Sequence, residues 1–336
     1  MLFTKEIGID LGTANTLVYM KGKGIIIREP SVVAVDSRTE EPKYVGQEAK
    51  EVIGRTPGSI TAVRPLKDGV IADFEITSAM LNEFIQKALK GSFFFTRANV
   101  IICIPSGVTA VERRAVKEAA ENAGARRVNI IEEPMAAAIG AGLPVSEPAG
   151  SMIVDIGGGT TEVAVLSLGG VVVSRSLRVA GNEIDDAIVQ FMRREYQVLI
   201  GDGTAEALKK NIGSVYPGLD RGEMEIRGRN LRTGLPAVMT LTSDQMRAAM
   251  KPQIESILDT VCSALEATPP ELSADLYDFG IMLAGGGALL GGLAPLLSER
   301  TGVRVTVAKK PLDSVALGIG RVIEGGMDGV VNYRAR

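Results

Sequence analysis

"IGIDLGTANTLVYM" at residues 7–20 returns in altered form as "MIVDIGGGTTEVAVL" at residues 152–166. In each copy an apolar run ends in an aspartate. A turn that contains glycine and threonine follows, and after it comes a second run rich in β-branched residues. This pattern predicts a β-hairpin with a polar tip. One Asp-x-Gly turn is common in ordinary proteins, whereas two copies in the same strand context indicate a shared role.

The two predicted tips are suited to hold a phosphate chain. Gly12 and residues 157–159 allow close approach to the backbone, and consecutive N–H groups in such turns form an anion-binding hollow. Further side-chain donors come from Thr13, Asn15, Thr160 and Thr161. Asp10 and Asp155 end the incoming strands, where a carboxylate holds Mg²⁺ directly or through its waters. Two facing hairpins would therefore clamp a phosphate chain and its metal from both sides.

Composition excludes several classes of protein. The chain has 336 residues, 46% hydrophobic and 23% charged, which is enough for two domains. The net charge is −3 with both signs interspersed, so nucleic acid is not expected as a partner. The lack of histidine excludes histidine bases, Ser-His triads and histidine metal sites. Cys103 and Cys262 lack CxxC spacing, which favours two buried thiols in a reducing cytoplasm.

Two segments bear on membranes and export. The N-terminus has no secretory signal pattern. Residues 279–298 are uncharged for twenty positions, long enough to cross a bilayer, but contain six glycines and Pro295. This stretch reads better as a strand, a glycine turn and a short helix.

Strand and helix signals alternate along much of the chain. "NVIICIP" (99–105) and "RVNIIEEP" (127–134) predict buried strands, and Thr109 with Glu112 forms a capping-box signal for a helix that ends at Gly124. This order predicts an α/β fold. A long amphipathic helix, with a possible kink at Pro252, is predicted by the spacing of Met246, Met250, Ile254, Ile257, Val261 and Leu265.

A third glycine cluster, "IMLAGGGALLGG" (281–292), also follows an apolar strand. It has neither the GxxxxGK[ST] of a P-loop nor a clean GxGxxG. Two interpretations stay open: close approach to a nucleotide base or α-phosphate, and tight packing between a strand and a helix.

The two hairpins, "IIEEPMAAAIGAG" and "LAGGGALL", in this order, resemble the superfamily of actin, the seventy-kilodalton heat-shock chaperones and the sugar kinases. Segments spread over nearly the whole chain are similar to the MreB family of bacterial actins: "GIDLGTANTLVY", "RPLKDGVIADFE", "VERRAVKEAAENAGARRV", "VDIGGGTTEVAVLS", "TAEALKKNIG" and "TPPELSAD". The resemblance implies an actin-like ATPase fold, in which two ribonuclease-H-like domains enclose a nucleotide cleft.

Each domain of that fold carries a small subdomain. The resemblance implies a first large subdomain at 1–31 and 77–145 with its small subdomain at 32–76. The second large subdomain would cover 146–181 and 243–336, with its small subdomain at 182–242. The weak secondary-structure pattern at 30–75 and 201–242 independently suggests insertions at these places.

The resemblance further implies ATP and Mg²⁺ as cofactors, with Asp10 and Asp155 organising the metal. Glu133, immediately before Pro134, would orient or deprotonate the attacking water together with Thr160. The adjacent Glu132 is the alternative candidate for this role. Taken alone, Glu206 and Lys209 also fit a solvated helix face. Nucleotide contacts are implied for Gly12, Thr13, Ala14, Asn15, Gly157, Gly158, Gly159, Thr160, Ala205, Glu206, Lys209, Gly285, Gly286, Gly287 and Ala288.

One loop departs from the superfamily pattern. Many members have a Gly-Gly pair followed by an acidic residue where this chain has "VAGNEIDDA". Ala180 and Asn182 therefore put the ligand contacts of that loop in doubt.

The implied function is a weak ATPase that is primarily cytoskeletal. It would polymerise into paired protofilaments on the inner face of the cell membrane, with cell-wall elongation proteins as partners, and so maintain rod shape. The alternative is a non-filamentous ATPase or kinase of the same superfamily. No motif supports a kinase's aspartate base, and the chain shows no peptide-binding domain of a chaperone after the ATPase region.

"GSFFFTR" (91–97) collects Phe93, Phe94 and Phe95 in a predicted loop flanked by basic residues. An exposed phenylalanine triplet needs a partner, and we predict insertion into the membrane surface. One such anchor is weak, but a filament repeats it many times. The alternatives are the start of a core strand and a protein partner.

Overall fold

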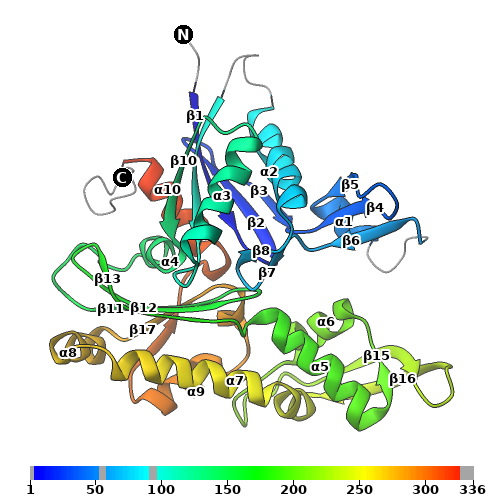
Figure 1. Ribbon diagram of the computed structural model, residues 1–336. Coiled ribbons are helices and arrows are strands. Elements are labelled where there is room, and N and C mark those ends of the chain that lie inside the picture. The colour runs from blue at the N-terminus through cyan, green and yellow to red at the C-terminus, as the bar shows by residue number, and fades with distance from the viewer. Residues whose placement is uncertain (1–3, 53–57, 91–96, 326–336) are drawn as a thin grey trace.

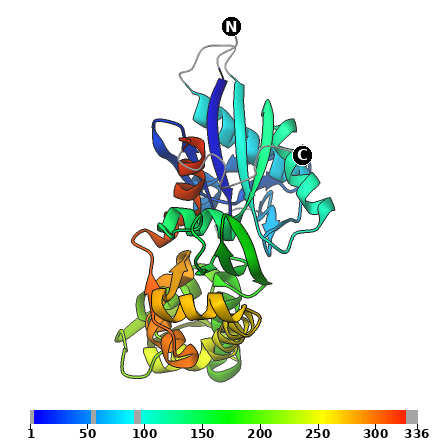
Figure 2. The same cartoon turned by 90° about the vertical axis from the view of Figure 1, so that its left-hand side faces the viewer.

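The computed structural model describes residues 4–52, 58–90 and 97–325. Figures 1 and 2 show two lobes, one above the other, each built around a five-stranded sheet. The upper sheet has the order β10-β9-β1-β2-β3, and the lower sheet has the order β13-β12-β11-β17-β18. In each, an antiparallel run of three strands adjoins parallel strands at its first member. The two lobes therefore repeat one plan.

The strands of the large sheets have the following bounds. The upper sheet contains β1 (Thr4–Leu11), β2 (Asn15–Met20), β3 (Gly24–Pro30), β9 (Arg97–Ile104) and β10 (Arg127–Glu132). The lower sheet contains β11 (Ser151–Ile156), β12 (Thr161–Ser167), β13 (Gly170–Leu177), β17 (Ile281–Ala284) and β18 (Val305–Val307). Both predicted hairpins are confirmed, since β1 pairs with β2 and β11 pairs with β12 in antiparallel register.

Helices cover the sheets and supply the other half of each core. The upper lobe has α2 (Phe74–Leu89) and α3 (Ala110–Asn122); the lower has α7 (Ser243–Glu266), α8 (Pro270–Phe279), η1 (Gly286–Leu289), α9 (Leu293–Thr301) and η2 (Pro311–Asp313). The predicted capping box at Thr109 and Glu112 is confirmed. The apolar spacing in α7 is also confirmed, and the helix is assigned continuously through Pro252.

The two lobes are joined through α4 (Glu133–Ala141) and α10 (Ser314–Ile323). A Cβ atom on Gly140 would clash with the carbonyl oxygen of Ser314, and one on Gly318 would clash with that of Ala136. The backbones of these helices therefore touch. Around them lies a shared apolar core to which both sheets contribute, including Ile101, Cys103, Ile131, Met135, Ile153 and Ile319.

Smaller units extend from the right of both lobes in Figure 1. The upper one has the sheet order β5-β4-β6, from β4 (Val33–Asp36), β5 (Pro42–Val45) and β6 (Ile60–Val63), with α1 (Gln47–Val52). The lower has the order β14-β15-β16, from β14 (Val198–Leu199), β15 (Glu223–Asn230) and β16 (Pro236–Thr242), with α5 (Gly181–Tyr196) and α6 (Asp202–Ile212). The subdomain boundaries stay a prediction. A short hairpin, β7 (Leu66–Lys67) with β8 (Val70–Ile71), leads back to the upper lobe.

The fold shows what becomes of the uncharged stretch 279–298 and of the two cysteines. The uncharged stretch 279–298 contains β17, η1 and the start of α9, as its glycines suggested. Across the described ranges, we find no helix with both the length and the apolar character needed to cross a bilayer. Both cysteines are free; Cys103 is buried and Cys262 is partly buried.

Candidate functional site between the lobes

The tips of the two hairpins touch where the lobes meet. A Cβ atom placed on Gly158 would lie 2.5 Å from the Cβ of Ala14, and one placed on Gly159 would lie 2.8 Å from Oγ1 of Thr13. Such separations leave no room for side chains at these glycines. The two glycine-containing turns thus form one continuous surface rich in backbone N–H groups, although they are far apart in the sequence.

Asp10 and Asp155 lie at the base of these tips and share one environment. Burial raises the pKa of Asp10 to about 7. Burial, followed by the charges of Asp10 and Glu162, raises the pKa of Asp155 to about 8. Asp155 is buried and Asp10 is partly buried, and two neighbouring carboxylates with limited access to water favour either protonation or a bound cation.

The residues present fit Mg²⁺ held together with phosphates. Mg²⁺ commonly binds one or two carboxylates, keeps several waters and shares phosphate oxygens with a substrate. Asp10 and Asp155 would supply the two carboxylates, and the backbone N–H groups of the neighbouring turns would supply donors to the phosphates. Within the described part of the chain there is no group of three or more acidic or cysteine side chains that would form a metal site from protein ligands alone.

The structure places the neighbouring residues Glu132 and Glu133 in different surroundings. Glu132 pairs with Arg113 of α3 at 3.8 Å between Oε1 and a guanidinium nitrogen. Glu133 is the first residue of α4, and burial raises the pKa of its carboxyl well above the usual range, with further contributions from Glu162, Asp10 and Asp155. The charges of Asp10 and Asp155 therefore act on Glu133, which places Glu133 beside the aspartate pair.

The sequence analysis missed Glu162, a charged residue within the apolar strand β12. Its side chain is 1% exposed and its carboxylate accepts hydrogen bonds from the Ser106 backbone N–H at 3.1 Å and the Ser176 hydroxyl at 2.5 Å. Burial raises the pKa of Glu162, and the hydrogen bonds from Ser176 and Ser106 offset only part of that rise. A glutamate among apolar strand residues was the available signal, because a buried carboxylate needs such partners.

The β7–β8 turn was also missed as part of the site. Gly69 donates its backbone N–H to Oγ1 of Thr13 at 3.1 Å, and a Cβ atom on Gly69 would lie 2.8 Å from Cγ2 of Thr160. Asp68 and Gly69 have φ angles of 51° and 76°, typical of a two-residue hairpin turn. The Asp-Gly pair predicts such a turn, but its contact with both tips depends on the tertiary fold.

The third glycine cluster packs against the second aspartate. A Cβ atom on Gly285 would clash with Asp155 and with the Ile156 carbonyl, and one on Gly287 would clash with the Ile156 side chain. Ala288 is buried. Tight packing thus accounts for Gly285 and Gly287, while nucleotide contacts of residues 285–288 stay a prediction.

On α6, the predicted nucleoside residues already have partners within the protein. Lys209 donates to the Gly181 carbonyl at 2.7 Å and pairs with Asp185 at 2.8 Å. Glu206 pairs with Lys210 at 2.5 Å, and Ala205 is buried. The Glu206 carboxylate is thus held by Lys210, and the Lys209 side chain is held at the start of α5 by Gly181 and Asp185.

The loop that departs from the superfamily pattern is anchored through its backbone. Gly181 donates its N–H to the Gly157 carbonyl at 3.1 Å, and Asn182 donates its N–H to the Gly158 carbonyl at 2.7 Å. Ala180 donates its N–H to the Glu183 carboxylate at 2.8 Å. Because these contacts use main-chain atoms of residues 180–182, the loop stays attached to the second tip without a particular side chain at Ala180 or Asn182.

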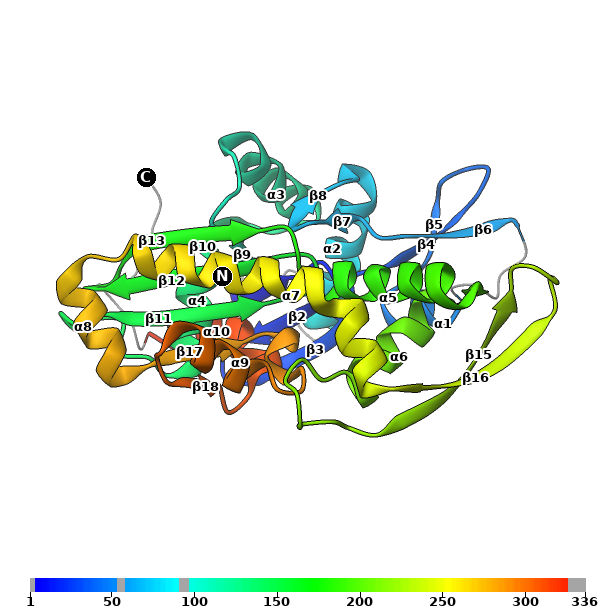
Figure 3. The ribbon, with the colours of Figure 1, turned by 90° about the horizontal axis from the view of Figure 1, so that it is seen from below.

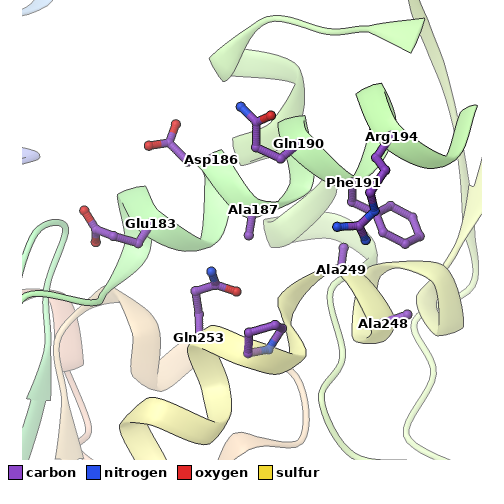
Figure 4. Close-up of a pocket in the computed structure, with 10 residues that line it drawn as sticks. Glu183, Asp186, Ala187, Gln190, Phe191, Arg194, Ala248, Ala249 and Gln253 are labelled. Atoms are coloured by element: carbon purple, nitrogen blue, oxygen red, sulfur yellow. The ribbon is translucent and has the colours of Figure 1, made fainter. Parts of the chain in front are cut away.

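A pocket of about 390 Å³ lies elsewhere, between α5 and α7 (Figure 4). Ala187 of α5 and Gln253 of α7 point toward each other across it, and Glu183, Asp186, Phe191 and Arg194 are among its other lining residues. No residue predicted for the site lines this pocket. We assign the functional site to the hairpin tips, where the buried carboxylates and the N–H-rich turns converge.

Comparison with known proteins identifies the family. The MreB/Mbl protein family profile matches residues 4–328. The chain belongs to the MreB/Mbl family. Among its relatives, cell shape-determining protein MreB of Escherichia coli (strain K12) is 54% identical over 327 residues, covering 96% of this chain and 94% of that protein. Cell shape-determining protein Mbl of Bacillus cereus (strain ATCC 10987 / NRS 248) is 50% identical over 323 residues, covering 96% and 97%.

Solved structures of another MreB/Mbl relative confirm the fold. MreB5 of Spiroplasma citri, in a crystal structure bound to AMPPNP, superposes with a TM-score of 0.91 at 39% identity and covers 97% of each chain. The same protein bound to ADP superposes with a TM-score of 0.90. The predicted actin-like fold of two domains with small subdomains is therefore correct.

Proposed function

We propose that this chain binds ATP with Mg²⁺ between its lobes, hydrolyses the ATP slowly, and assembles into filaments that maintain rod shape. The contact between the two hairpin tips above Asp10 and Asp155 carries the proposal, because it unites anion-binding turns with a pair of carboxylates. The AMPPNP and ADP complexes of the Spiroplasma citri relative support nucleotide binding.

Each predicted site residue has a role in this proposal. Residues 12–15 and 157–160 donate hydrogen bonds to the β- and γ-phosphates from opposite sides. Glu206 accepts hydrogen bonds from ribose hydroxyls, with Ala205 and Lys209 beside it, and residues 285–288 lie against the adenosine. Asp10 and Asp155 would hold Mg²⁺, which would supply positive charge against that of the phosphates.

Hydrolysis needs a group that accepts a proton from the attacking water. Burial and the neighbouring acids raise the pKa of the Glu133 carboxyl. A cation bound by Asp10 and Asp155 would favour the ionised carboxylate, which is the form that accepts a proton. The Thr160 hydroxyl helps to position the same water. Thr13, which accepts the Gly69 N–H, links the first tip to the β7–β8 turn.

Filament assembly requires different, complementary surfaces at opposite ends of the molecule. At one end, α8 exposes Tyr277 by 73% and Phe279 by 62%. At the other, the β15–β16 hairpin exposes Leu235 by 64% and Val238 by 60%. Figures 1 and 3 place α8 and this hairpin at opposite ends of the long dimension of the lower lobe. We propose a head-to-tail contact between these ends.

The filaments would lie on the inner face of the cell membrane and organise cell-wall elongation proteins. The names of the Escherichia coli and Bacillus cereus relatives, both cell shape-determining proteins, support this role. The predicted anchor, Phe93 to Phe95, lies outside the described residues. Its flanking strand β9 begins at Arg97, which pairs with Thr4 of β1 at the far end of the upper sheet.

The test is electron microscopy and sedimentation of the purified chain with ATP and Mg²⁺, in solution and on anionic liposomes. We expect protofilaments that form with nucleotide and bind the liposomes. Replacing Phe93, Phe94 and Phe95 by serine should reduce lipid binding while assembly in solution persists. A monodisperse ATP-hydrolysing monomer under all these conditions would instead support the non-filamentous ATPase or kinase.

A further inference from the structure

Two ion pairs connect the small units across the gap between the lobes. Nζ of Lys50, in the last turn of α1, lies 3.7 Å from Oε2 of Glu206 on α6. A guanidinium nitrogen of Arg64, which follows β6, lies 3.9 Å from Oδ2 of Asp202, also on α6. Figure 1 shows α1 in the upper small unit above α6 in the lower one, on the right of the molecule.

The two acidic partners form one face of α6. Asp202 and Glu206 are four residues apart, so their side chains project from the same side of the helix, one turn from each other. The cations come from two different elements of the upper small unit. Two separate attachments resist both sliding and rotation of one unit against the other, which a single pair would not.

The face of α6 also connects to the nucleotide turns. Lys210 contacts Oε1 of Glu206 at 2.5 Å, which leaves Oε2 directed toward Lys50. One turn further, Lys209 donates to the carbonyl of Gly181, whose own N–H bonds the carbonyl of Gly157 in the second tip. A displacement of α6 away from α1 would therefore pull on the turn proposed to bind the phosphates.

We propose that Lys50 and Arg64 are nucleotide-retaining residues, which hold α6 over the bound nucleotide by pairing with Glu206 and Asp202. Lys50 acts as a positioning residue, since it directs the carboxylate that would accept the ribose hydroxyls. Opening the cleft to release nucleotide requires both pairs to separate. The inference rests on the proposed nucleotide site and adds to it a route by which the upper small unit controls release.

Lys50, Arg64 and Asp202 are exposed and Glu206 is partly buried, so the effect of each pair is modest. Exposed ion pairs of this kind change an equilibrium or a rate by up to about fivefold, and salt screens them. We therefore expect Lys50→Ala and Arg64→Ala each to accelerate ADP release about two- to fivefold at low salt. Raising the salt from about 0.05 to about 0.5 M should accelerate release from the unaltered chain and have little effect on the double variant.

The experiment measures release of ADP carrying an etheno label on its base, chased with unlabelled ADP and Mg²⁺ below the assembly concentration. A base label leaves the ribose hydroxyls free. Lys43→Ala is the matched control, because Lys43 pairs at 3.9 Å with Glu41 of the same small unit. The charge reversal Arg64→Asp should accelerate release, and adding Asp202→Arg should restore it toward the original rate.

Each outcome decides the inference. Faster release from the Lys50 and Arg64 variants, rescue by the reversed pair and an unchanged control support it. Unchanged release from both variants, failure of the rescue, or equal acceleration by the control would overturn it while leaving the nucleotide site intact. If the unaltered chain binds no labelled ADP, the proposed nucleotide site itself is wrong.

Discussion

The two lobes contact each other in two places with opposite physical character. At the joint, α4 and α10 pack backbone against backbone at glycines within a shared apolar core. At the mouth, where α1 and β6 of the upper small unit face α6 of the lower one, the units meet through ion pairs of 3.7 and 3.9 Å between side chains that water reaches. Packed interiors have one stable arrangement, whereas exposed ion pairs form and break at low cost. The fold therefore restricts relative movement of the lobes at the joint and permits it at the mouth.

The largest change in activity is expected for Glu133, at the start of α4 between the joint and the mouth. Glu133→Gln should lower the rate of ATP hydrolysis about 10²- to 10⁴-fold, because the amide accepts no proton from water. Nucleotide affinity should change little. Steady-state phosphate release measures the effect, and Glu132→Gln is the matched control, since Glu132 pairs with Arg113 instead. Equal loss in both variants would show that Glu133 has no distinct role.

At the joint, Gly318→Ala should destabilise the chain by about 3 kcal/mol or more, because the new methyl group meets the Ala136 carbonyl oxygen. Urea unfolding monitored by circular dichroism measures the change. Gly203→Ala in α6 is the control, because a Cβ atom there meets nothing within 4 Å. It should be neutral or stabilising by up to about 1 kcal/mol. If both variants were equally stable, the joint would be looser than its contacts indicate.

Filament assembly should depend on the exposed apolar residues at the two ends of the lower lobe, Phe279 on α8 and Leu235 in the β15–β16 hairpin. Phe279→Asp and Leu235→Asp should each raise the concentration needed for filaments about tenfold or more, since burying a large apolar side chain contributes about 1.5–3 kcal/mol. Sedimentation with ATP and Mg²⁺ measures this, and unchanged nucleotide binding controls for folding. Normal assembly of either variant would remove that end from the proposed contact.

A further expected effect is a pH dependence of stability without Mg²⁺. The folded chain raises the pKa of Asp155 from 3.8 to about 8, so it binds more protons than the unfolded chain between these values. Stability from this group is therefore present at low pH and lost as pH rises toward about 8. The Tm should therefore fall as the pH rises from about 4 to about 8, by about 2–4 °C per kcal/mol lost. Asp155→Asn should flatten the dependence; an identical slope would exclude Asp155 as its source.

Much of the fold was predictable because its signals are local. The alternation at 7–20 and 152–166 specified both hairpins, Thr109 and Glu112 specified the start of α3, and the periodic apolar positions specified α7. In each case a few neighbouring residues contain the whole physical cause, namely strand alternation, a capped helix end or a helical stripe.

Parts of the candidate site were missed because their signals are not local. Glu162 and Gly69 acquire their roles only from what the fold brings beside them, Ser106 and Ser176 in one case and Thr13 in the other. Glu132 and Glu133 are identical neighbours, and the position before Pro134 already favoured Glu133 in the sequence. Their different environments come from the fold, which pairs Glu132 with Arg113 of α3 and brings Glu133 near Glu162 of β12.

Local sequence patterns were enough to predict two glycine-containing hairpin turns, two aspartates at the ends of strands, and membership of a family of actin-like proteins. The tertiary structure alone decided that the turns touch, that the aspartates share one buried environment, and that Lys50 and Arg64 face α6 across the gap. The physical reason is range: backbone conformation follows from adjacent residues, whereas burial, charge coupling and pairing depend on which distant surfaces meet.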